Sequence, residues 1–228
     1  MAVLSDARIL EYLFDKKLTI SPIIYDHIQP SSIDLTLDRI IKVPKPGRIV
    51  NMLDKTDDCF DEVSIETYTL RPGGFVMAQI RERLKIPRNL MGMIQNRNSI
   101  VRLGLNLGLS TYINPGYEGQ LPIAIHNIGA LEVPLIPGMR ICQLVLLDVE
   151  PEPHRDYSQR ENSKYQGESG YLLSKIYEEP ELKEFLRKKK NGENVDSISK
   201  FLEQRLREKS KDIREQLSEE ELREIELL

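Results

Sequence analysis

The stretch that decides the fold runs from Gln95 to Asn127 and begins Q-N-R-N-S-I-V-R-L-G-L. After a short connection it continues Y-I-N-P-G-Y-E-G-Q-L-P-I-A-I-H-N. The first half predicts a polar loop with arginines, and the Pro-Gly pair in the second half predicts a tight turn. An apolar strand follows the turn. This order can place phosphate-binding donors beside a pocket floor made of backbone.

Short strand-like runs lie on both sides of this stretch, and each ends near Gly or Pro. They cover residues 33–38, 63–70, 75–84, 90–94, 120–126, 131–136 and 140–149. Many short strands with this punctuation and almost no helix indicate an antiparallel β-sandwich or barrel from about residue 29 to 150. A short helix over Ala7 to Phe14, capped by Ser5 or Asp6, is expected before it. Residues 51–62 are acidic, and we interpret them as a solvated loop rather than a metal site.

Composition limits the classes of function. The net charge of −4 gives no global attraction to nucleic acid or to an anionic membrane, so phosphate binding needs a local cluster. Two cysteines, Cys59 and Cys142, form neither a disulfide framework nor a metal set. The N-terminus lacks signal-peptide character, and no apolar run is long enough to span a bilayer. We therefore expect a cytoplasmic protein that binds neither nucleic acid nor membrane.

A charged helical tail is predicted after about residue 178. One helix is expected over Glu181 to Lys190, and a longer one begins at a cap formed by Asp196 or Ser197. An apolar stripe follows that second helix: Ile198, Leu202, Leu206, Ile213 and Leu217. Ser218 with Glu221 predicts a capping box for a last turn. The simplest interpretation is a packing or oligomerisation element, and a partner-binding helix is the alternative.

Several familiar catalytic patterns are absent from the sequence. It has no Walker loop, no G-x-G-x-x-G, no G-x-S-x-G and no H-E-x-x-H. The H-x-E with P-C-x-x-C of zinc-dependent nucleobase deaminases is also missing, so no zinc is expected. His27, His126 and His154 lack ligand spacing and are interpreted as structural or exposed.

What remains is anion chemistry in two segments. Arg97, Ser99 and Arg102 lie within six residues, and arginine forks with a hydroxyl can bind phosphate oxygens. Surface arginines at the end of a strand are the equally open alternative. A polar segment repeats the chemistry with Tyr157, Arg160, Lys164 and Tyr165. Two cationic segments flanking a β core indicate a nucleotide site, with tyrosines available to cover a ring.

These residues resemble the dCTP deaminase branch of the trimeric dUTPase superfamily over about residues 1–170. The likeness is carried by Q-P-S-S-I-D-L-T-L at 29–37, N-R-N-S-I-V-R-L-G-L at 96–105, I-N-P-G-Y-E-G at 113–119, P-G-M-R-I-C-Q-L at 137–144 and Y-S-Q-R-E-N-S-K-Y-Q-G at 157–167. The 96–105 segment is similar to the family's phosphate motif, and the last segment is similar to its closing arm.

The resemblance implies a mainly β, dUTPase-like barrel or sandwich that assembles as a homotrimer with nucleotide sites between subunits. It divides the chain into a β domain at 1–170, with a closing arm at 157–170, and an added helical tail at 178–228. It also implies Mg²⁺ carried on a bound triphosphate. Around a deoxynucleoside triphosphate (dCTP, dUTP or dTTP) it places these residues: Arg97, Ser99, Arg102, Asn114, Tyr157, Lys164, Tyr165 and Glu168.

The departures from the family pattern fall on the chemistry. Ala124 stands where family deaminases carry the glutamate that activates water, and Asn114 replaces the aspartate of I-D-P-G. Alanine accepts no proton, and general acid–base catalysis contributes roughly 10²–10⁴ in rate. Asn96, Asn98 and Glu168 replace a glycine, a serine and a glutamine of the pattern. Glu118 and Glu132 lie near but off the motif position.

Three hypotheses follow. The favoured one is a nucleotide-binding homologue in pyrimidine nucleotide metabolism whose deamination is weak or lost. The second is an active dCTP deaminase or dUTPase-like pyrophosphatase that uses a different base. The third is a structural or regulatory trimer that acts through its helical tail.

Overall fold

The structure, a computed structural model, describes residues 2–108, 112–160, 163–170, 173–195 and 197–216. By its internal contacts the chain divides into two compact units. The first contains residues 1–50 and 56–173, and the second contains residues 51–55 and 174–228. The predicted limits at 170 and 178 remain a proposal for where the β domain ends and the tail begins.

Helix α1 (Asp6–Phe14) opens the first unit. The Ser5 hydroxyl accepts a hydrogen bond from the backbone N–H of Arg8, 3.5 Å between heavy atoms, and so caps the helix. Ile9 and Tyr12 are buried on its inner face. The predicted helix and its Ser5 cap are therefore confirmed.

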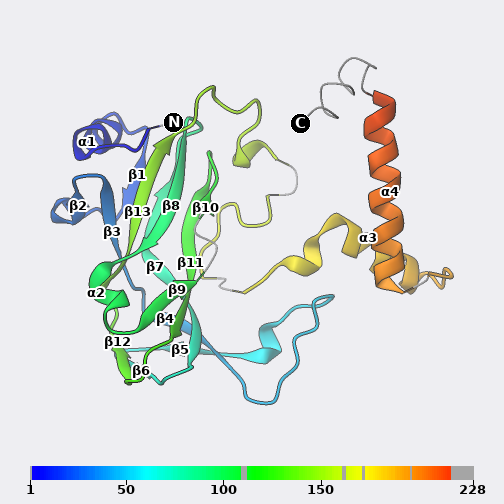
Figure 1. The fold of residues 1–228 in the computed structure, drawn as a ribbon, viewed down its shortest axis with the longest axis horizontal. Helices are drawn as coiled ribbons and strands as arrows, with labels where there is room; N and C mark the ends of the chain where they lie inside the picture. Colours follow the sequence, from blue (N-terminus) through cyan, green and yellow to red (C-terminus); the bar gives the residue numbers. More distant parts are fainter. Residues whose placement is uncertain (1, 109–111, 161–162, 171–172, 196, 217–228) are drawn as a thin grey trace. The chain divides into compact units, whose positions relative to one another are not determined.

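Two antiparallel sheets make up the body of the first unit (Figure 1). One sheet has the order β5-β4-β7-β11-β9 with β1 beside β7, and the other has the order β10-β8-β13-β3-β2. A separate small pair joins β12 to β6. The strands of the first sheet are β1 (Thr19–Ser21), β4 (Ile40–Pro44), β5 (Phe60–Ser64), β7 (Phe75–Lys85), β9 (Leu105–Gly108) and β11 (Glu118–Asn127). The others are β2 (Ile28–Gln29), β3 (Ser32–Thr36), β6 (Tyr68–Leu70), β8 (Leu90–Asn96), β10 (Tyr112–Ile113), β12 (Val133–Leu135) and β13 (Arg140–Asp148).

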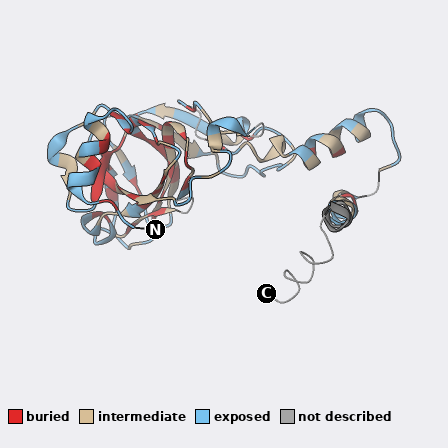
Figure 2. Ribbon diagram, turned by 90° about the horizontal axis from the view of Figure 1, so that it is seen from above, coloured by how far each residue is buried: buried red, intermediate tan, exposed pale blue. Residues whose placement is uncertain are grey.

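The alternation of apolar and polar residues in the sequence matches an alternation of buried and more exposed positions in the strands. Along β11 every second residue is buried, and most of β7 and β13 follows the same period. The buried side chains of the two sheets form one apolar core, visible as the red interior of this unit in Figure 2. The sheets are tied where the Glu82 carboxylate of β7 accepts hydrogen bonds from the N–H and hydroxyl of Thr36 on β3.

Two details of the β prediction were wrong. Strand β3 does not alternate, because all five of its residues are buried. Its polar residues Asp34 and Thr36 are buried because they have internal partners. The acidic loop at 51–62 is only partly a loop, since Phe60–Ser64 forms β5 against β4. The edge carboxylates Asp61 and Glu62 pair with Lys45 and Lys42 across that ladder.

The second unit carries the tail, with 3₁₀ turn η4 (Ile176–Glu178) and helices α3 (Pro180–Lys190) and α4 (Ile198–Gln216). Leu182 and Phe185 of α3 are buried, and the ring of Phe185 lies 5.5 Å from that of Phe201 on α4. Both predicted helices are confirmed. The stripe is wrong at Leu206, which is 68% exposed, whereas Phe201 is 6% exposed and makes the contact with α3.

Other predictions on the tail fall outside what the structure describes. The Asp196 cap, the side chain of Ile213, Leu217 and the capping box of Ser218 with Glu221 lie outside the described residues. In the described part of the chain, no helix is long and apolar enough to cross a membrane.

Candidate functional site

The predicted phosphate segment sits where β8 ends. Arg97 occupies the N-cap position of the short helix α2 (Asn98–Val101) without a side-chain capping bond, and Arg102 follows the last residue of the helix. Asn98, Ser99 and Arg102 are exposed, so their polar groups are open to a ligand. Ile100 is buried and fixes the helix against the core. The sequence therefore presents Ser99 and Arg102 on a rigid turn rather than on a loose loop.

Arg97 points inward to a buried carboxylate. Its Nε donates to Asp34 Oδ1 at 3.1 Å, and its Nη1 donates to the carbonyl of Arg140 at 3.2 Å. The Asp34 side chain is 1% exposed, and its other oxygen accepts from Arg140 Nη1 at 3.1 Å. The expected picture of three freely exposed anion ligands thus holds for Ser99 and Arg102, while Arg97 is anchored.

Asn96 has a structural explanation. Its Oδ1 accepts from the N–H of Leu107 at 2.8 Å, and its Nδ2 donates to Asn106 Oδ1 at 2.9 Å. The side chain thereby ties the end of β8 to β9. A glycine at this position would make neither bond.

The Pro-Gly turn forms as predicted before β11. The N–H of Tyr117 donates to the carbonyl of Asn114 at 3.1 Å, and Gly116 has φ +80°. Ala124 lies half-buried in the middle of β11, paired with Gly108 on β9 and Met77 on β7. None of these three residues carries an acid or a base. The position that resembles the family's base therefore has no proton acceptor of its own.

The arm folds back on this turn through backbone hydrogen bonds. The N–H of Tyr157 donates to Pro115 at 2.8 Å, and that of Gly167 donates to Glu118 at 2.7 Å. The N–H of Gln120 donates to Glu168 at 2.8 Å. Gln166 adds a side-chain bond, with Nε2 donating to the carbonyl of Gly116 at 3.1 Å. The structure thus brings Asn114 of the turn and the arm residues into one region.

Aromatic rings line the junction of arm and turn. Tyr157, in the 3₁₀ turn η3 (Tyr157–Gln159), lies 6.3 Å from the ring of Tyr117, and its hydroxyl accepts from the N–H of Tyr165 at 3.2 Å. The Lys164 ammonium is 5.9 Å from the centre of the Tyr165 ring. Glu168 was predicted to contact the ligand, but in the single chain it is buried and only 6% exposed. Burial, with the nearby Glu168 charge, raises the pKa of Tyr117.

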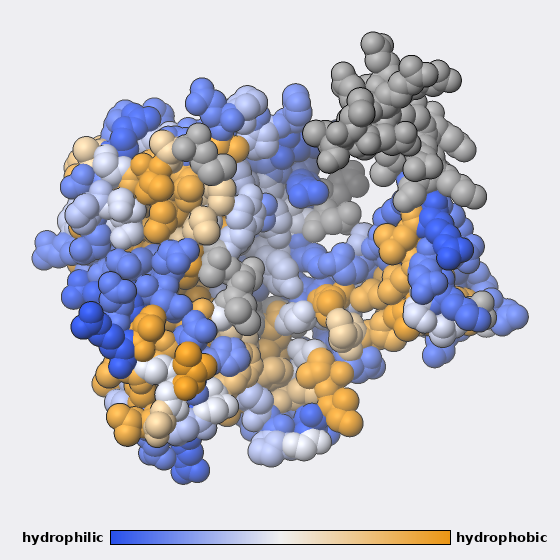
Figure 3. All heavy atoms as spheres, in the orientation of Figure 1, coloured by the Kyte–Doolittle hydropathy of each residue, from blue (hydrophilic) through white to orange (hydrophobic). Residues whose placement is uncertain are grey.

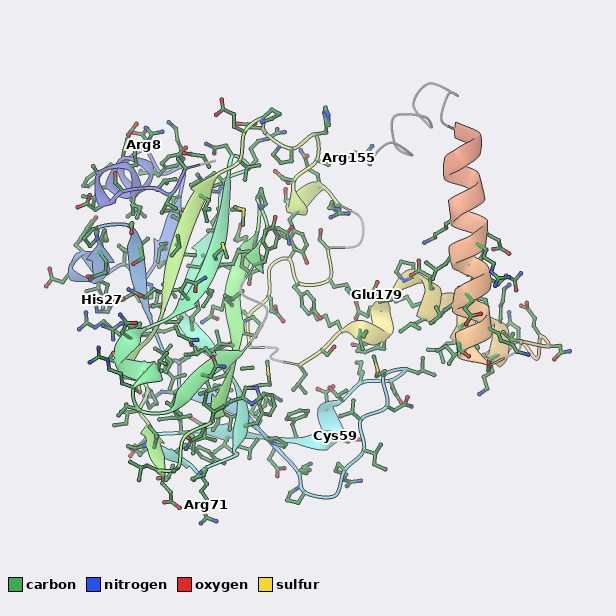
Figure 4. All side chains as sticks on the ribbon, in the orientation of Figure 1. Arg8, His27, Cys59, Arg71, Arg155 and Glu179 are labelled. Atoms are coloured by element: carbon green, nitrogen blue, oxygen red, sulfur yellow. The ribbon has the colours of Figure 1, made fainter. Side chains whose placement is uncertain are left out.

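The two cationic segments lie apart within one chain. Figure 1 shows α2 at the left of the first unit and the yellow-green segment around η3 at its upper right. Arg155, just before the arm, is on that same upper right side in Figure 4. One chain therefore brings Asn114, Tyr157 and Tyr165 together but does not add Ser99 and Arg102 to them.

The two glutamates near the motif are engaged elsewhere. Glu118 contacts Arg83 at 3.0 Å and Lys85 at 3.8 Å, and Glu132 contacts Arg71 at 3.5 Å. Both carboxylates are therefore paired with cations of the same chain. Among the described residues, no group of three or more His, Cys, Asp or Glu side chains is arranged to hold a metal ion.

Sequence reasoning missed Asp34, Arg140 and Gln166 as members of this region. Asp34 and Arg140 lie inside the motifs at 29–37 and 137–144, which we used only to recognise core strands. A charged residue in the middle of a buried strand was the available signal for Asp34. Gln166 lies inside the arm motif and gave no separate signal.

Known proteins are similar to this chain in sequence. The dCTP deaminase-like family model matches residues 3–149. A dUMP-forming dCTP deaminase of Methanosphaera stadtmanae is 35% identical over 191 residues, covering 78% of this chain and 96% of that protein. A dCTP deaminase of Haloarcula marismortui is 36% identical over 184 residues, covering 76% and 94%.

A solved structure supports the fold. The 2'-deoxycytidine 5'-triphosphate deaminase of Agrobacterium tumefaciens superposes with a TM-score of 0.53 at 23% identity. The match covers 64% of this chain and 48% of that one, so this chain spans about half the length of that relative. The predicted mainly β, dUTPase-like fold with an N-terminal helix and an added C-terminal helical segment is confirmed. By sequence and by fold, this chain belongs to the dCTP deaminase-like family.

Proposed function

We propose that the protein binds a deoxynucleoside triphosphate as a member of pyrimidine nucleotide metabolism, and that its deamination activity is weak or lost. The observation that carries the proposal is a contrast between two positions. Arg102 and Ser99 are presented on α2 with open donors, whereas Ala124 and Asn114 supply no carboxylate. The chain retains the means to bind phosphate and lacks the usual means to activate water.

The same geometry supports a homotrimer with sites between subunits. The α2 segment and the arm lie apart in one chain, so a site containing both needs a second copy (Figure 1). Exposed hydrophobic residues adjoin α2, as the orange atoms at the lower left of Figure 3 show. The exposed apolar residues of this part of the chain are Val101 at the end of α2, Leu103 just after it, and Ile128 and Leu131 in the loop after β11. A 2.8 Å bond from the Ile128 N–H to the Gly104 carbonyl joins the two segments. Contiguous exposed apolar residues mark protein–protein interfaces.

Mg²⁺ fits this site as an ion carried by the nucleotide. Mg²⁺ is commonly held by phosphate oxygens together with one or two carboxylates. The turn offers the neutral amide of Asn114, and α2 offers cationic and hydroxyl groups that suit phosphate rather than metal. We therefore assign Ser99, Arg102, Lys164 and Arg97 to the triphosphate, and the ion to the oxygens of that triphosphate. A cytoplasmic location follows from this role and is part of the proposal.

Two alternatives make different predictions. An active dCTP deaminase or dUTPase-like pyrophosphatase would need a base other than the residue at 124. A structural or regulatory trimer would act through its α3–α4 tail and bind no nucleotide.

The test uses the purified full chain with dCTP, dUTP and dTTP in Mg²⁺. Calorimetry measures binding, and chromatography follows conversion to dUTP or dUMP. We expect binding of at least one triphosphate with little or no product. Turnover of dCTP at ordinary enzymatic rates would favour the active alternative, and no binding of any triphosphate would leave the structural one.

Arg102→Ala is the sharpest binding variant, because Arg102 is exposed and its guanidinium makes no hydrogen bond or ion pair with a described residue. Loss of one charge-assisted phosphate contact should weaken binding by about 1.5–3 kcal/mol with unchanged stability. Arg71→Ala is the matched control, since Arg71 is 83% exposed and lies at the far lower end of the β domain (Figure 4).

A further inference from the structure

Asp34 and its two arginines form a charged cluster at one end of the second sheet. Asp34 lies on β3, Arg140 opens β13, and Arg97 follows β8. These three strands are neighbours in the order β8-β13-β3. Register places Gln143 of β13 opposite both Asp34 and Gln95. The cluster is therefore built from residues that are far apart in sequence and adjacent in the sheet.

The charges in this cluster do not cancel. A buried carboxylate needs one cation to compensate its loss of hydration. Asp34 is 1% exposed and has two, with Arg97 on Oδ1 and Arg140 on Oδ2. The pair of arginines keeps one net positive charge after Asp34 is neutralised.

The guanidinium groups also keep open donors. Arg97 uses Nε and Nη1 on Asp34 and on the Arg140 carbonyl, and Arg140 uses Nη1 on Asp34. Nη2 of Arg97 and Nε and Nη2 of Arg140 have no hydrogen-bond partner among the described residues. The Arg140 side chain is 43% exposed and that of Arg97 is 21% exposed, so the open donors can reach a ligand from solvent.

A local irregularity aims Arg140 at Asp34. The register of β13 against β3 shifts between Arg140 and Cys142, which leaves one extra residue on β13. Such a bulge bends the strand and redirects the side chain beside it. Thr36, opposite Arg140, donates its N–H and hydroxyl hydrogen bonds to the Glu82 carboxylate instead. The orientation of Arg140 is thus set by the backbone and fixed by Asp34.

We propose that Arg140 is a further phosphate-binding residue of the triphosphate site, and that Asp34 is a positioning residue that holds Arg97 and Arg140 as one two-arginine anion cradle beside Ser99. The inference rests on the proposed nucleotide site and extends it to residues in two other motifs. Two guanidiniums fixed by a shared carboxylate lose less rotamer freedom on binding than two free ones.

The experiment measures binding of Mg²⁺-dUTP, Mg²⁺-dTTP and inorganic tripolyphosphate to the full chain by calorimetry. We expect Arg140→Ala to weaken binding of the phosphate ligands by roughly 10-fold to 100-fold. Arg140→Lys should recover only part of this loss, because an ammonium keeps the charge without the fork. Arg71→Ala should bind as wild type.

Asp34→Asn distinguishes a positioning role of the Asp34 carboxylate from the effect of its negative charge on an anionic ligand. The substitution removes a negative charge from an anion site, so Coulomb attraction alone predicts tighter binding. A positioning role predicts weaker binding, because the amide holds neither guanidinium as a carboxylate does. Weaker binding with a native circular dichroism spectrum supports the proposal, and tighter binding overturns the role of Asp34.

The remaining outcomes are also decisive. If Asp34→Asn does not fold, the comparison of Arg140→Ala with Arg140→Lys carries the test. Wild-type affinity in Arg140→Ala overturns the inference while leaving the proposed function intact. Failure of the wild type to bind any nucleotide or tripolyphosphate overturns both, and binding of tripolyphosphate alone keeps the anion cradle and removes the nucleotide assignment.

Discussion

The two halves of residues 95–127 are held in opposite ways. The α2 half is fixed by side-chain charge, through Arg97 on the buried Asp34. The turn half is fixed by backbone, through the bonds that join Pro115, Glu118 and Gln120 to the arm. A region held by backbone can lose its functional side chains without losing its shape. The backbone bonds therefore hold the shape of the turn independently of the side chains of Asn114 and Ala124.

Ala124→Glu has the largest expected effect, because it introduces a carboxylate into the half of the segment that is held by backbone. It returns a carboxylate to a half-buried strand position beside Gly108, whose missing side chain leaves room. We expect the rate of dCTP deamination to rise by a factor of about 10²–10⁴ over that of the wild type. Chromatography of the products dUTP and dUMP measures this rate. Ala124→Gln, with the same size and no basicity, should stay at the wild-type rate. Equal rates in the two variants would mean that Asn114 or Asn98 also blocks the reaction.

Asp34→Ala tests whether charge holds the α2 half. The substitution leaves two arginines without their carboxylate, and we expect a loss of about 3 kcal/mol in the free energy of unfolding, measured in urea. The value is at the low end for a buried pair, because both guanidiniums are partly exposed. Asp58→Ala, an exposed carboxylate of the same unit, serves as control. A loss below 1 kcal/mol would contradict the anchoring role.

Gly116→Ala tests whether backbone geometry holds the turn half. A Cβ at this position would lie 2.6 Å from the Asp156 carboxyl carbon, and φ is +80°. Strain and crowding together should cost about 2 kcal/mol of stability and make the arm more sensitive to limited proteolysis. Gly167→Ala has a similar φ of +74° with open space around it, so it measures strain alone. Equal effects in the two variants would remove the crowding argument.

Glu82→Gln has the smallest expected effect and tests the contact of Glu82 on β7 with Thr36 on β3. Burial raises the pKa of Glu82, while hydrogen bonds from Thr36 oppose the rise. The folded state then binds this proton more tightly than the unfolded state, whose value is near 4.5. The free energy of unfolding should therefore fall as pH rises from 4.5 through the folded pKa, and the substitution should remove that fall.

The measurement is a series of urea titrations at increasing pH. The stability of the variant minus that of the wild type should increase across this window and then level off. Glu66→Gln, which changes an exposed glutamate of the same unit, is the matched control for the series. A flat difference for Glu82→Gln would contradict the burial argument.

The sequence predicted the parts of the fold that depend on local periodicity. Strands β7, β11 and β13 alternate strictly over much of their length, and the structure has them within a few residues of the prediction. Helix α1 begins after the Ser5 cap, and helix α3 begins at Pro180 and ends before Asn191. These signals lie within one segment of chain and need no tertiary information.

What the sequence could not predict depends on pairing across the chain. The Arg97–Asp34 bond spans 63 residues and the Arg140–Asp34 bond spans 106, so neither is visible without the register of β3, β8 and β13. In the tail, Phe201 of α4 packs against α3 and Leu206 does not. The reason is that α3 covers a face of α4 other than the one that carries the predicted apolar stripe. Residue types alone predict a candidate anion site at 97–102, but they do not predict that Arg97 is anchored on Asp34.

The arm's attachment also has a kinetic consequence. The N–H groups of Gln120, Tyr157 and Gly167 are bonded across the junction of arm and turn, so each can exchange with solvent only when that junction opens. If a nucleotide enters or leaves beneath the arm, its dissociation rate cannot exceed the opening rate that these amides report. Hydrogen exchange at these three positions would therefore set a lower limit on the residence time of such a ligand.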